Sequence, residues 1–490
     1  MSHPAGRGEP GTSSNVHSES TSESTSDSHS RSGSSDEPLD SRQPSPPAQE
    51  ALAAEDLQDE SDTHDGQVTG PGRRRSRWDI RRLVVDTRPL SIPAYRRLWT
   101  STIVTSVGSQ LTAVAVPKQI YDITGSSAYV GLAGLVALVP LVVFALWGGA
   151  IADAVDRRKL LLVTNTGIAV TSLLFWAQAF AGAHSVWVLF GLLGLQQACA
   201  GVNQPARSAS IPRLVPARLL PAANALGSTV FQIGSIIGPL LAGVLIPILG
   251  LSTLYLIDSV ALTVTIWAVW RLPALPPLAG APRRAGLRHV IEGFGYLATR
   301  KVLLVSFLAD VIAMVFGMPR ALFPQMAQQT FGDPPGGGFA LGILFAAIPA
   351  GAVLGGLFSG AFSRIRRHGV AVVGAVCAWG LAIVGFGLSP WLWLAAFFLA
   401  VAGMADLVSM VFRGTIMQSA ATDEMRGRMQ GVFTVVVAGG PRLADLLHGT
   451  AGAAVGTSLA VSGGGALVLV AMLAAVVAFP IFWRYRAQDS

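Results

Sequence analysis

The sequence predicts an all-α membrane protein with twelve transmembrane helices arranged in two six-helix halves. Of its 490 residues, 51% are hydrophobic and 13% are charged, and beyond Tyr95 long apolar runs follow one another with short polar gaps. Such runs suit membrane helices, which need about 20 apolar residues to cross ~30 Å of hydrocarbon. A duplicated motif indicates the two halves, because the segment 148–159, a glycine pair followed by basic residues, recurs in altered form at 355–367.

The apolar runs give the expected spans in order along the chain. In the first half we expect them at 95–121, 129–152, 159–181, 185–207, 221–249 and 251–270. In the second half we expect 301–323, 339–362, 370–388, 390–418, 429–450 and 459–483. The expected domains are therefore 92–272 and 301–484, joined by a basic, proline-containing cytoplasmic linker over 273–300.

The N-terminal segment 1–78 has a different composition from the rest. Its first 70 residues carry 14 of the 28 acidic residues, many serines and almost no aromatic or β-branched side chains. Such a segment cannot bury enough apolar area to offset its ordering entropy, so we expect a disordered cytoplasmic tail. The tail ends in a basic stripe formed by Arg73, Arg74, Arg75, Arg77, Arg81 and Arg82. The stripe fits an amphipathic helix on an anionic membrane surface or a solvated linker.

The distribution of lysine and arginine predicts the orientation of the spans. Alternate loops hold nearly all of the basic residues, including Arg157, Arg158, Arg213, Arg364 and Arg426, whereas the opposite loops hold little besides Lys118. Basic residues concentrate in cytoplasmic loops. We therefore expect a multi-pass protein of a bacterial inner membrane with both termini in the cytoplasm.

Several function classes are excluded by the residue inventory. Only two cysteines are present, both within apolar runs, and the eight histidines are scattered, so we expect no metal site and no cofactor. No phosphate-binding glycine loop ends in Lys-Ser or Lys-Thr, which argues against a nucleotide-driven enzyme. The basic residues are spread over many loops, so nucleic acid is a poor partner. We expect a non-enzymatic membrane protein.

The expected fifth span carries small residues on one helical face, together with a proline. Gly234, Gly238 and Gly243 let a neighbouring backbone approach closely, and Pro239 bends the helix. One interpretation is a tight seam between the halves that restrains leak in an exchanger. Ordinary small-residue packing is the alternative.

These features together resemble the major facilitator superfamily of transporters. The motif Gly149, Ala152, Asp153, Arg157 and Arg158 is similar to the superfamily signature between its second and third helices, with Ala154 and Asp156 as departures. An aspartate before the basic pair is typical of the branch similar to the bacterial enterobactin exporter. Further strings of that branch lie at 205–209, 221–226, 403–409 and 423–428. The resemblance covers about residues 92–484.

The resemblance implies a gating latch at the cytoplasmic mouth. In this family the aspartate at the position of Asp153 meets a helix N-terminus of the other half, beside Gly149. The arginines at Arg157 and Arg158 bridge to acidic or carbonyl partners. Arg207 and Arg413 are equivalent under the internal repeat, and we interpret them as gating or bridging residues, with snorkelling to phosphates as the alternative.

Charged and polar residues inside spans are the candidate proton and substrate groups, because each is costly in hydrocarbon. Asp310 is the leading candidate for a proton-titrating carboxylate, with a structural ion pair as the alternative. Asp258 lies on a peripheral helix, where we expect a structural role. The remaining candidates are Gln110, Arg320, Asp406, Arg442 and Asp445, of which the last pair is three residues apart on one span.

The sequence thus predicts a secondary active exporter, monomeric, with the bilayer, protons and a small molecule as partners. The expected substrate is a polar or acidic metabolite such as a siderophore, exchanged for protons. Multidrug or antibiotic efflux is one alternative. A non-transporting receptor or scaffold on the same fold is another, which the intramembrane charges disfavour.

Overall fold

The computed structural model describes residues 86–277, 287–362 and 365–486, and all of its regular structure in these ranges is helical. The expected tail over 1–78 and its basic stripe lie outside the described residues. Inside some helices, among them the stretch around Asp153, the description is limited to the backbone.

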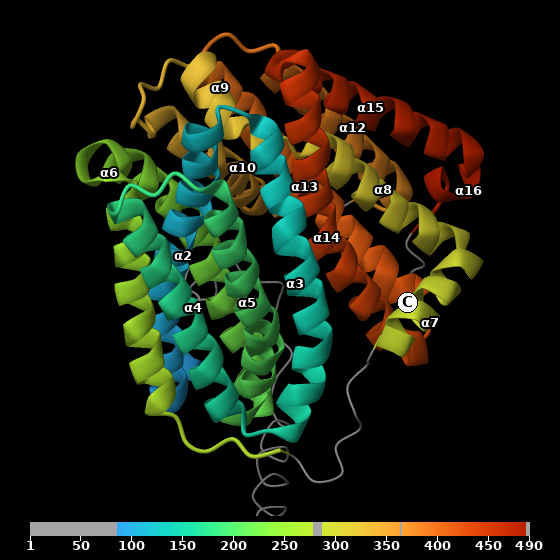
Figure 1. Cartoon of the computed structure of the whole chain (residues 1–490). Helices are drawn as coiled ribbons and strands as arrows, with labels where there is room; N and C mark the ends of the chain where they lie inside the picture. The colour runs from blue at the N-terminus through green and yellow to red at the C-terminus, as the bar shows by residue number, and fades with distance from the viewer. Residues whose placement is uncertain (1–85, 278–286, 363–364, 487–490) are drawn as a thin grey trace, which may run out of the picture. The chain divides into compact units, whose positions relative to one another are not determined.

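The first group of helices runs from residue 88 to residue 270 (Figure 1). Its elements are η2 Arg88–Ser91, α2 Pro93–Thr124, α3 Ser127–Ala154, α4 Arg157–Phe180, α5 Val186–Leu214, η3 Ala217–Leu219 and α6 Leu220–Trp270. Within α6, Gly250 has φ 76° and ψ 163°, a left-handed conformation that glycine adopts without steric cost. It reverses the chain, so α6 is two helices, as the sequence predicts.

The second group begins after the linker. Its elements are α7 Leu287–Thr299, α8 Lys301–Gly317, η4 Arg320–Leu322, α9 Phe323–Gln329, α10 Phe339–Leu357, α11 Ser359–Phe362, α12 His368–Gly387, α13 Leu392–Ala420, α14 Asp423–Val455, α15 Thr457–Ala478 and α16 Pro480–Trp483. Gly456, at φ 89°, separates α14 from α15. We call outer the end of the helices that carries Gly250 and Gly456, and inner the opposite end.

Nine stretches of the described chain are long and apolar enough to cross a membrane. One of them, Ala217–Trp270, has 54 residues and contains both helices of α6. Helices α2 and α14 are less apolar and are not among the nine, but they have 32 and 33 residues and pack among the spans. At a rise of 1.5 Å per residue each is about 48 Å long, enough to cross the hydrocarbon layer.

Two expected segments have more internal structure than the sequence suggests. The span expected at 301–323 lies within the apolar stretch Lys301–Gln329, in which α8 ends at Gly317 and is followed by η4 and α9, because Pro319 disfavours helical geometry at Met318 before it. The linker expected over 273–300 contains helix α7, which packs against α14 through Gly293 and Val432. Helix α7 could not be predicted from the composition of the linker, because its prolines suggest an irregular segment and the packing against α14 is a tertiary contact.

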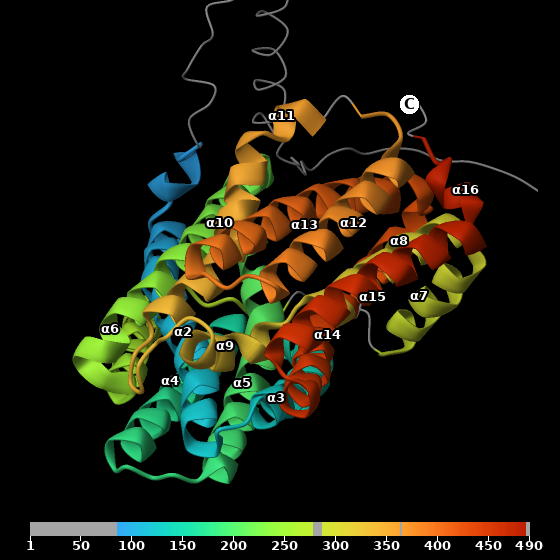
Figure 2. The same ribbon diagram turned by 90° about the horizontal axis from the view of Figure 1, so that it is seen from above.

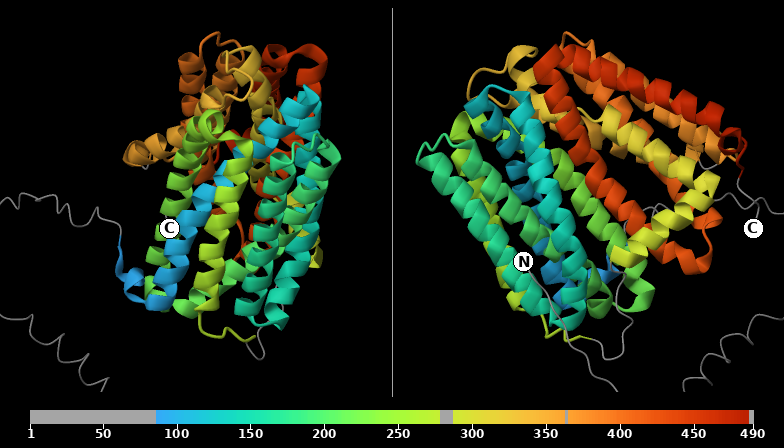
Figure 3. Two further views of the ribbon diagram at one scale, coloured as in Figure 1. Left: turned by 60° about the vertical axis from the view of Figure 1, so that its left-hand side comes forward. Right: turned by 45° about the vertical axis from the view of Figure 1, so that its right-hand side comes forward.

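The helices pack as two groups with matching partners (Figure 3). In the first group α2 packs on α6 and α3 packs on α5, and in the second group α8 packs on α14 and α10 packs on α13. Two further pairings join the groups, namely α3 with α14 and α10 with α6. The internal repeat exchanges these two pairings, as expected for halves related by a pseudo-two-fold axis.

Candidate transport site

Asp310 and Arg413 form a buried ion pair between α8 and α13. Asp310 is 2% exposed and Arg413 is 6% exposed, and Nη1 of the arginine contacts Oδ1 of the aspartate. Arg413 Nη2 also lies 3.9 Å from Asp406 Oδ1, and Arg413 Nε donates to the Ser409 carbonyl at 3.3 Å. Breaking a buried pair leaves an uncompensated charge, which costs about 3–5 kcal/mol. Arg413 therefore joins α13 to α8 through this contact.

A second set of charges lies beside this pair. Beyond the break that ends α8, Arg320 interacts electrostatically with Asp445, Arg442 and Asp406. Asp445 interacts with both arginines and with the backbone of Ala321. Asp406 interacts with Arg413, Asp310 and Arg320, so it links the two sets.

We call these six residues the central charge cluster: Asp310, Arg320, Asp406, Arg413, Arg442 and Asp445. It contains three acidic and three basic side chains from four elements, α8, η4, α13 and α14. The structure thus brings together all of the charged candidates for proton or substrate binding. The formal charges of these six side chains balance.

The first half has a related bridge in which the partner of the arginine is neutral. Arg207 of α5 donates through Nη2 to Thr102 Oγ1 of α2, the helix equivalent to α8. Arg207 and Arg413 therefore join equivalent pairs of helices; among the residues that the structure describes, the partner of Arg207 is a hydroxyl and that of Arg413 is a carboxylate. Gln110, the remaining candidate, lies on α2 where the backbone of Gly238 packs against its side chain.

Helices α3 and α14 meet at the outer end through glycines. A Cβ added to Gly131 would lie 2.5 Å from the Asp445 carbonyl oxygen, and one added to Gly449 would lie 2.5 Å from the Ser127 carbonyl oxygen. Ser127 Oγ donates to the Gly449 carbonyl at 3.0 Å. The two backbones are therefore in direct contact, and one of the contact residues belongs to the central charge cluster.

Helices α6 and α10 make the corresponding contact on the other side, as Figure 2 shows. A Cβ on Gly342 would meet the Pro239 carbonyl oxygen at 2.6 Å and the Gly243 Cα at 2.9 Å. Of the predicted seam residues, Gly243 and Pro239 thus face the other half. Gly234 and Gly238 instead pack against α2 of their own half, at Ser106 and Gln110.

A polar contact that the sequence reasoning missed also joins the halves at the outer end. Lys118 is 1% exposed and pairs with Asp122 at 2.7 Å within α2. Asp122 Oδ1 accepts a hydrogen bond from Gln328 of α9 at 2.7 Å, and Tyr121 accepts one from Gln329 at 2.9 Å. The expectation that Lys118 belongs to an outer loop is wrong. Its spacing of four from Asp122 is the sequence signal that could have revealed the pair.

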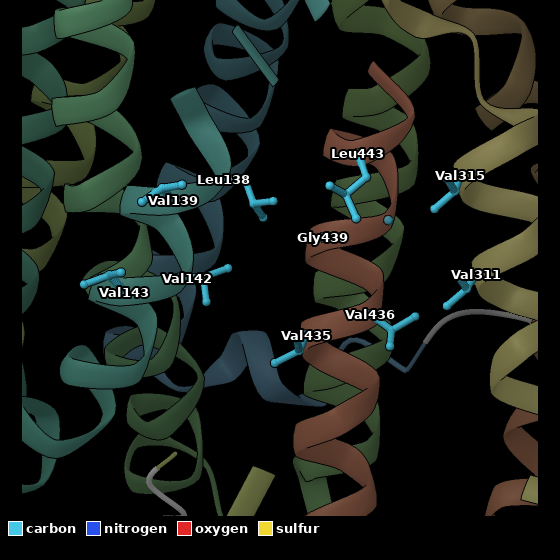
Figure 4. Close-up of a pocket in the computed structure, with 11 residues that line it drawn as sticks. Leu138, Val139, Val142, Val143, Val311, Val315, Val435, Val436, Gly439 and Leu443 are labelled. Carbon is cyan, nitrogen blue, oxygen red and sulfur yellow. The ribbon is translucent and has the colours of Figure 1, made fainter. Parts of the chain in front are cut away.

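Inward of the glycine contact, α3 and α14 diverge (Figure 1), and an apolar cleft lies between the halves (Figure 4). Its volume is about 470 Å³, and its lining is entirely aliphatic apart from two glycines. The lining residues come from α3, α8 and α14: Leu138, Val139, Val142, Val143, Val311, Val315, Val435, Val436, Gly439, Gly440 and Leu443. Val311 and Leu443 directly follow Asp310 and Arg442 in sequence, so α8 and α14 contribute residues both to the cleft and to the central charge cluster.

The predicted latch motif lies at the inner ends of α3 and α4. Gly149 and Asp153 belong to α3, and the side chain of Asp153 lies outside the described residues. Asp156 caps α4 by accepting from the Arg158 amide at 2.8 Å, and it also accepts from the Leu275 amide at 3.2 Å. This capping explains an aspartate where the superfamily often has glycine.

The two arginines of the motif bind backbone carbonyls of the first half. Arg157 Nη1 donates to Ala209 at 2.9 Å, and Arg158 Nη2 donates to Trp270 at 2.5 Å. They thereby attach the start of α4 to α5 and to the end of α6. Both of these carbonyl partners belong to the first half.

Asp258 is buried in a separate polar network of the first half. Its Oδ2 accepts hydrogen bonds from Thr112 at 2.8 Å and Ser172 at 2.9 Å, and Gln196 donates to Ser172 at 3.2 Å. These residues join α2, α4, α5 and α6. The arrangement fits the structural role expected for Asp258, since its partners are helix-packing hydroxyls.

Two packed helical groups around a buried charge cluster define a multi-pass membrane transport protein. A profile of the transmembrane secretion effector family matches residues 86–486, so the chain belongs to this family of major facilitator transporters. It is 30% identical over 392 residues to the enterobactin exporter EntS of Shigella boydii serotype 18, covering 79% of this chain and 92% of the relative. It is also 30% identical over 385 residues to EntS of Citrobacter koseri, covering 78% and 91%.

Solved structures with this fold are more distant in sequence. A bacterial homologue of the human lysosomal transporter Spinster has a TM-score of 0.64 at 13% identity, covering 83% of this chain and all of its own. The nucleoside transporter NupG has a TM-score of 0.59 at 15% identity, covering 80% and 100%. At this identity the likeness establishes the fold alone.

Proposed function

We propose that this chain is a secondary active exporter that moves a small polar or acidic metabolite, foremost a siderophore, in exchange for protons. The observation that carries the proposal is the central charge cluster, in which two buried Asp and Arg sets lie beside a cleft between the halves. The relatives named enterobactin exporter support the choice of a siderophore.

The cluster offers a simple coupling of anion to proton. An anionic substrate that binds Arg413 competes with Asp310 for the same guanidinium. Asp310, displaced in a low-dielectric site, is then stabilised by taking up a proton. Release of the substrate returns Arg413 to Asp310, which gives up the proton. Substrate and proton thus bind alternately, which is the requirement for exchange.

Alternating access supplies the other half of the mechanism. The contacts of α3 with α14 and of α6 with α10 close the outer end, while α3 and α14 diverge inward. For export, these outer contacts open once substrate is bound, and the latch at Asp153 closes the inner end. Glycine contacts suit this task because they carry no side chains that would have to be repacked.

The proposal includes a specific membrane topology. Twelve spans cross a bacterial inner membrane, with the inner end and both termini in the cytoplasm, and the working unit is a monomer. Helices α2 and α14 are the two proposed spans that are not among the nine apolar stretches. Their lower hydropathy comes from charged residues, which we propose are functional. The two helices of α6 count separately.

Comparing metabolites of cells with and without this chain under iron limitation tests the proposed substrate. We expect an iron-chelating acidic metabolite to accumulate inside cells that lack the chain and to return to the medium on complementation. Complementation by Arg413→Ala should fail at equal protein abundance. An unchanged extracellular metabolite profile in cells without the chain would contradict siderophore export.

Multidrug efflux is a second candidate because the cleft of Figure 4 is aliphatic and would accept lipophilic compounds. Resistance to cationic dyes distinguishes the two. If cells with the chain resist the dyes and Arg413→Ala leaves that resistance intact, drug efflux is the better account. The intramembrane charges disfavour a non-transporting scaffold, which has no need of them.

A further inference from the structure

A second cavity lies at the inner end of the second half, away from the central charge cluster. Its volume is about 550 Å³, and it is lined by Arg367, Trp483, Arg484 and Arg486. Arg367 immediately precedes α12, whereas the other three residues lie at the end of α16 and just after it. Three guanidinium groups from two distant segments therefore line one cavity, and none of the lining residues that the structure describes is acidic.

Close packing fixes the two segments against each other. A Cβ on Gly369 would lie 1.8 Å from the Phe482 carbonyl oxygen, so only glycine permits this approach. Phe482 is fully buried, and the Gly369 amide donates to the Tyr485 carbonyl at 3.4 Å. The Tyr485 hydroxyl lies 3.0 Å from Ser419 Oγ of α13. The arginines thus stand on a fixed backbone, which is a requirement for a built site.

The chemistry of the cavity selects an anion. Arg367 occupies the N-cap position of α12 and provides no side-chain cap, so the positive end of a 20-residue helix dipole faces the same region. Guanidinium groups bind phosphate oxygens in a bidentate manner, and several of them around one site repel each other until an anion neutralises them. A phosphate group satisfies the arginines and the helix terminus together.

The surroundings indicate that the phosphate belongs to a lipid. Leu473, Val477 and Ile481 on α15 and α16 are 57, 80 and 55% exposed, and this apolar run ends beside Trp483. Tryptophan favours the boundary between hydrocarbon and head groups, and basic cavities at the ends of spans suit anionic head groups.

We propose that this cavity binds the phosphate of an anionic membrane lipid, whose acyl chains lie along Leu473, Val477 and Ile481. The bound lipid joins the end of α16 to the start of α12 and steadies the inner end of the second half. This site is independent of the transported substrate, so it does not rest on the proposed function.

Binding of phosphatidylglycerol to the full-length purified chain, measured by native mass spectrometry, tests the proposal. The wild type should retain phosphatidylglycerol in preference to phosphatidylcholine. The double variant Arg367→Ala/Arg486→Ala should lose about tenfold or more in affinity, because it removes two of the three guanidinium groups that line the cavity. Arg484→Lys should weaken binding less than Arg484→Ala, because lysine keeps the charge. A general folding defect would not produce that order.

The control variant is Arg218→Ala, which removes an exposed arginine at the inner end of the first half, outside the cavity. It should bind lipid like the wild type. Equal retention of phosphatidylglycerol by the double variant and the wild type would overturn the proposal. So would displacement of the lipid by an equal concentration of inorganic phosphate or glycerol phosphate, which would assign the cavity to a soluble anion.

Discussion

Neutralising Asp310 is the sharpest perturbation of the central charge cluster. The variant Asp310→Asn keeps the size of the side chain and removes the charge that pairs with Arg413. Arg413 is 6% exposed, so solvent cannot replace the lost partner. Its remaining anionic neighbour is Asp406, at 3.9 Å.

The expected loss of stability follows from this geometry. Leaving a buried charge without its partner costs about 3–5 kcal/mol, and the proximity of Asp406 places the value near ~3 kcal/mol. In Asp310→Asn/Arg413→Gln both charges are gone, so no unpaired charge remains. The double variant should therefore be about 2–3 kcal/mol more stable than the sum of the single effects predicts.

A double-mutant cycle on the purified protein in mixed micelles, by reversible denaturant unfolding, measures this coupling. Counterflow in vesicles supplies the functional readout, and Asp310→Asn should keep substrate exchange while losing accumulation driven by a pH gradient. Purely additive free energies would refute the ion pair as a stabilising unit. Retention of gradient-driven accumulation would show that another group carries the proton.

Three further outcomes follow from the contacts between the halves and from the latch motif. Gly449→Leu should prevent closure of α3 on α14 and raise labelling of an outer-end cysteine by an impermeant reagent, whereas Gly463→Leu, with open space around its Cβ, should not. Asp122→Asn removes the charged partner of the buried Lys118 and should also raise labelling of the outer-end cysteine. If labelling stays at the wild-type level, this contact does not hold the outer end closed. Asp153→Asn should leave membrane insertion intact and reduce transport at equal protein abundance; unchanged transport would make Asp153 merely positional.

The arrangement of the spans could be predicted because hydrophobic length and charge placement act locally. The reversal at Gly250, between the spans expected at 221–249 and 251–270, follows from such a local pattern. The break after Gly317 was missed because the apolar run continues through Pro319 without a polar signal. Helix α7 was missed because its formation depends on packing against α14, which composition does not record.

The sequence could predict the candidate site only as a set of charged residues inside spans, where burial in hydrocarbon is energetically unfavourable. Sequence position marked Asp310 and Arg413 separately, but their pairing depends on how α8 and α13 pack. The same applies to Arg320, whose return toward Asp445 requires the break in the preceding helix. Lys118 was assigned to a loop because a charge near the end of a span resembles a loop charge when its partner four residues later, Asp122, is ignored.

Proton flux coupled to substrate movement tests the central claim most directly. Inside-out vesicles that contain the chain are energised until their lumen is acidic, and enterobactin is then added outside. The account predicts that enterobactin enters the lumen while protons leave it, and that Asp310→Asn abolishes the proton signal. Uptake of enterobactin that continues unchanged after the pH gradient has been collapsed would contradict proton-coupled export.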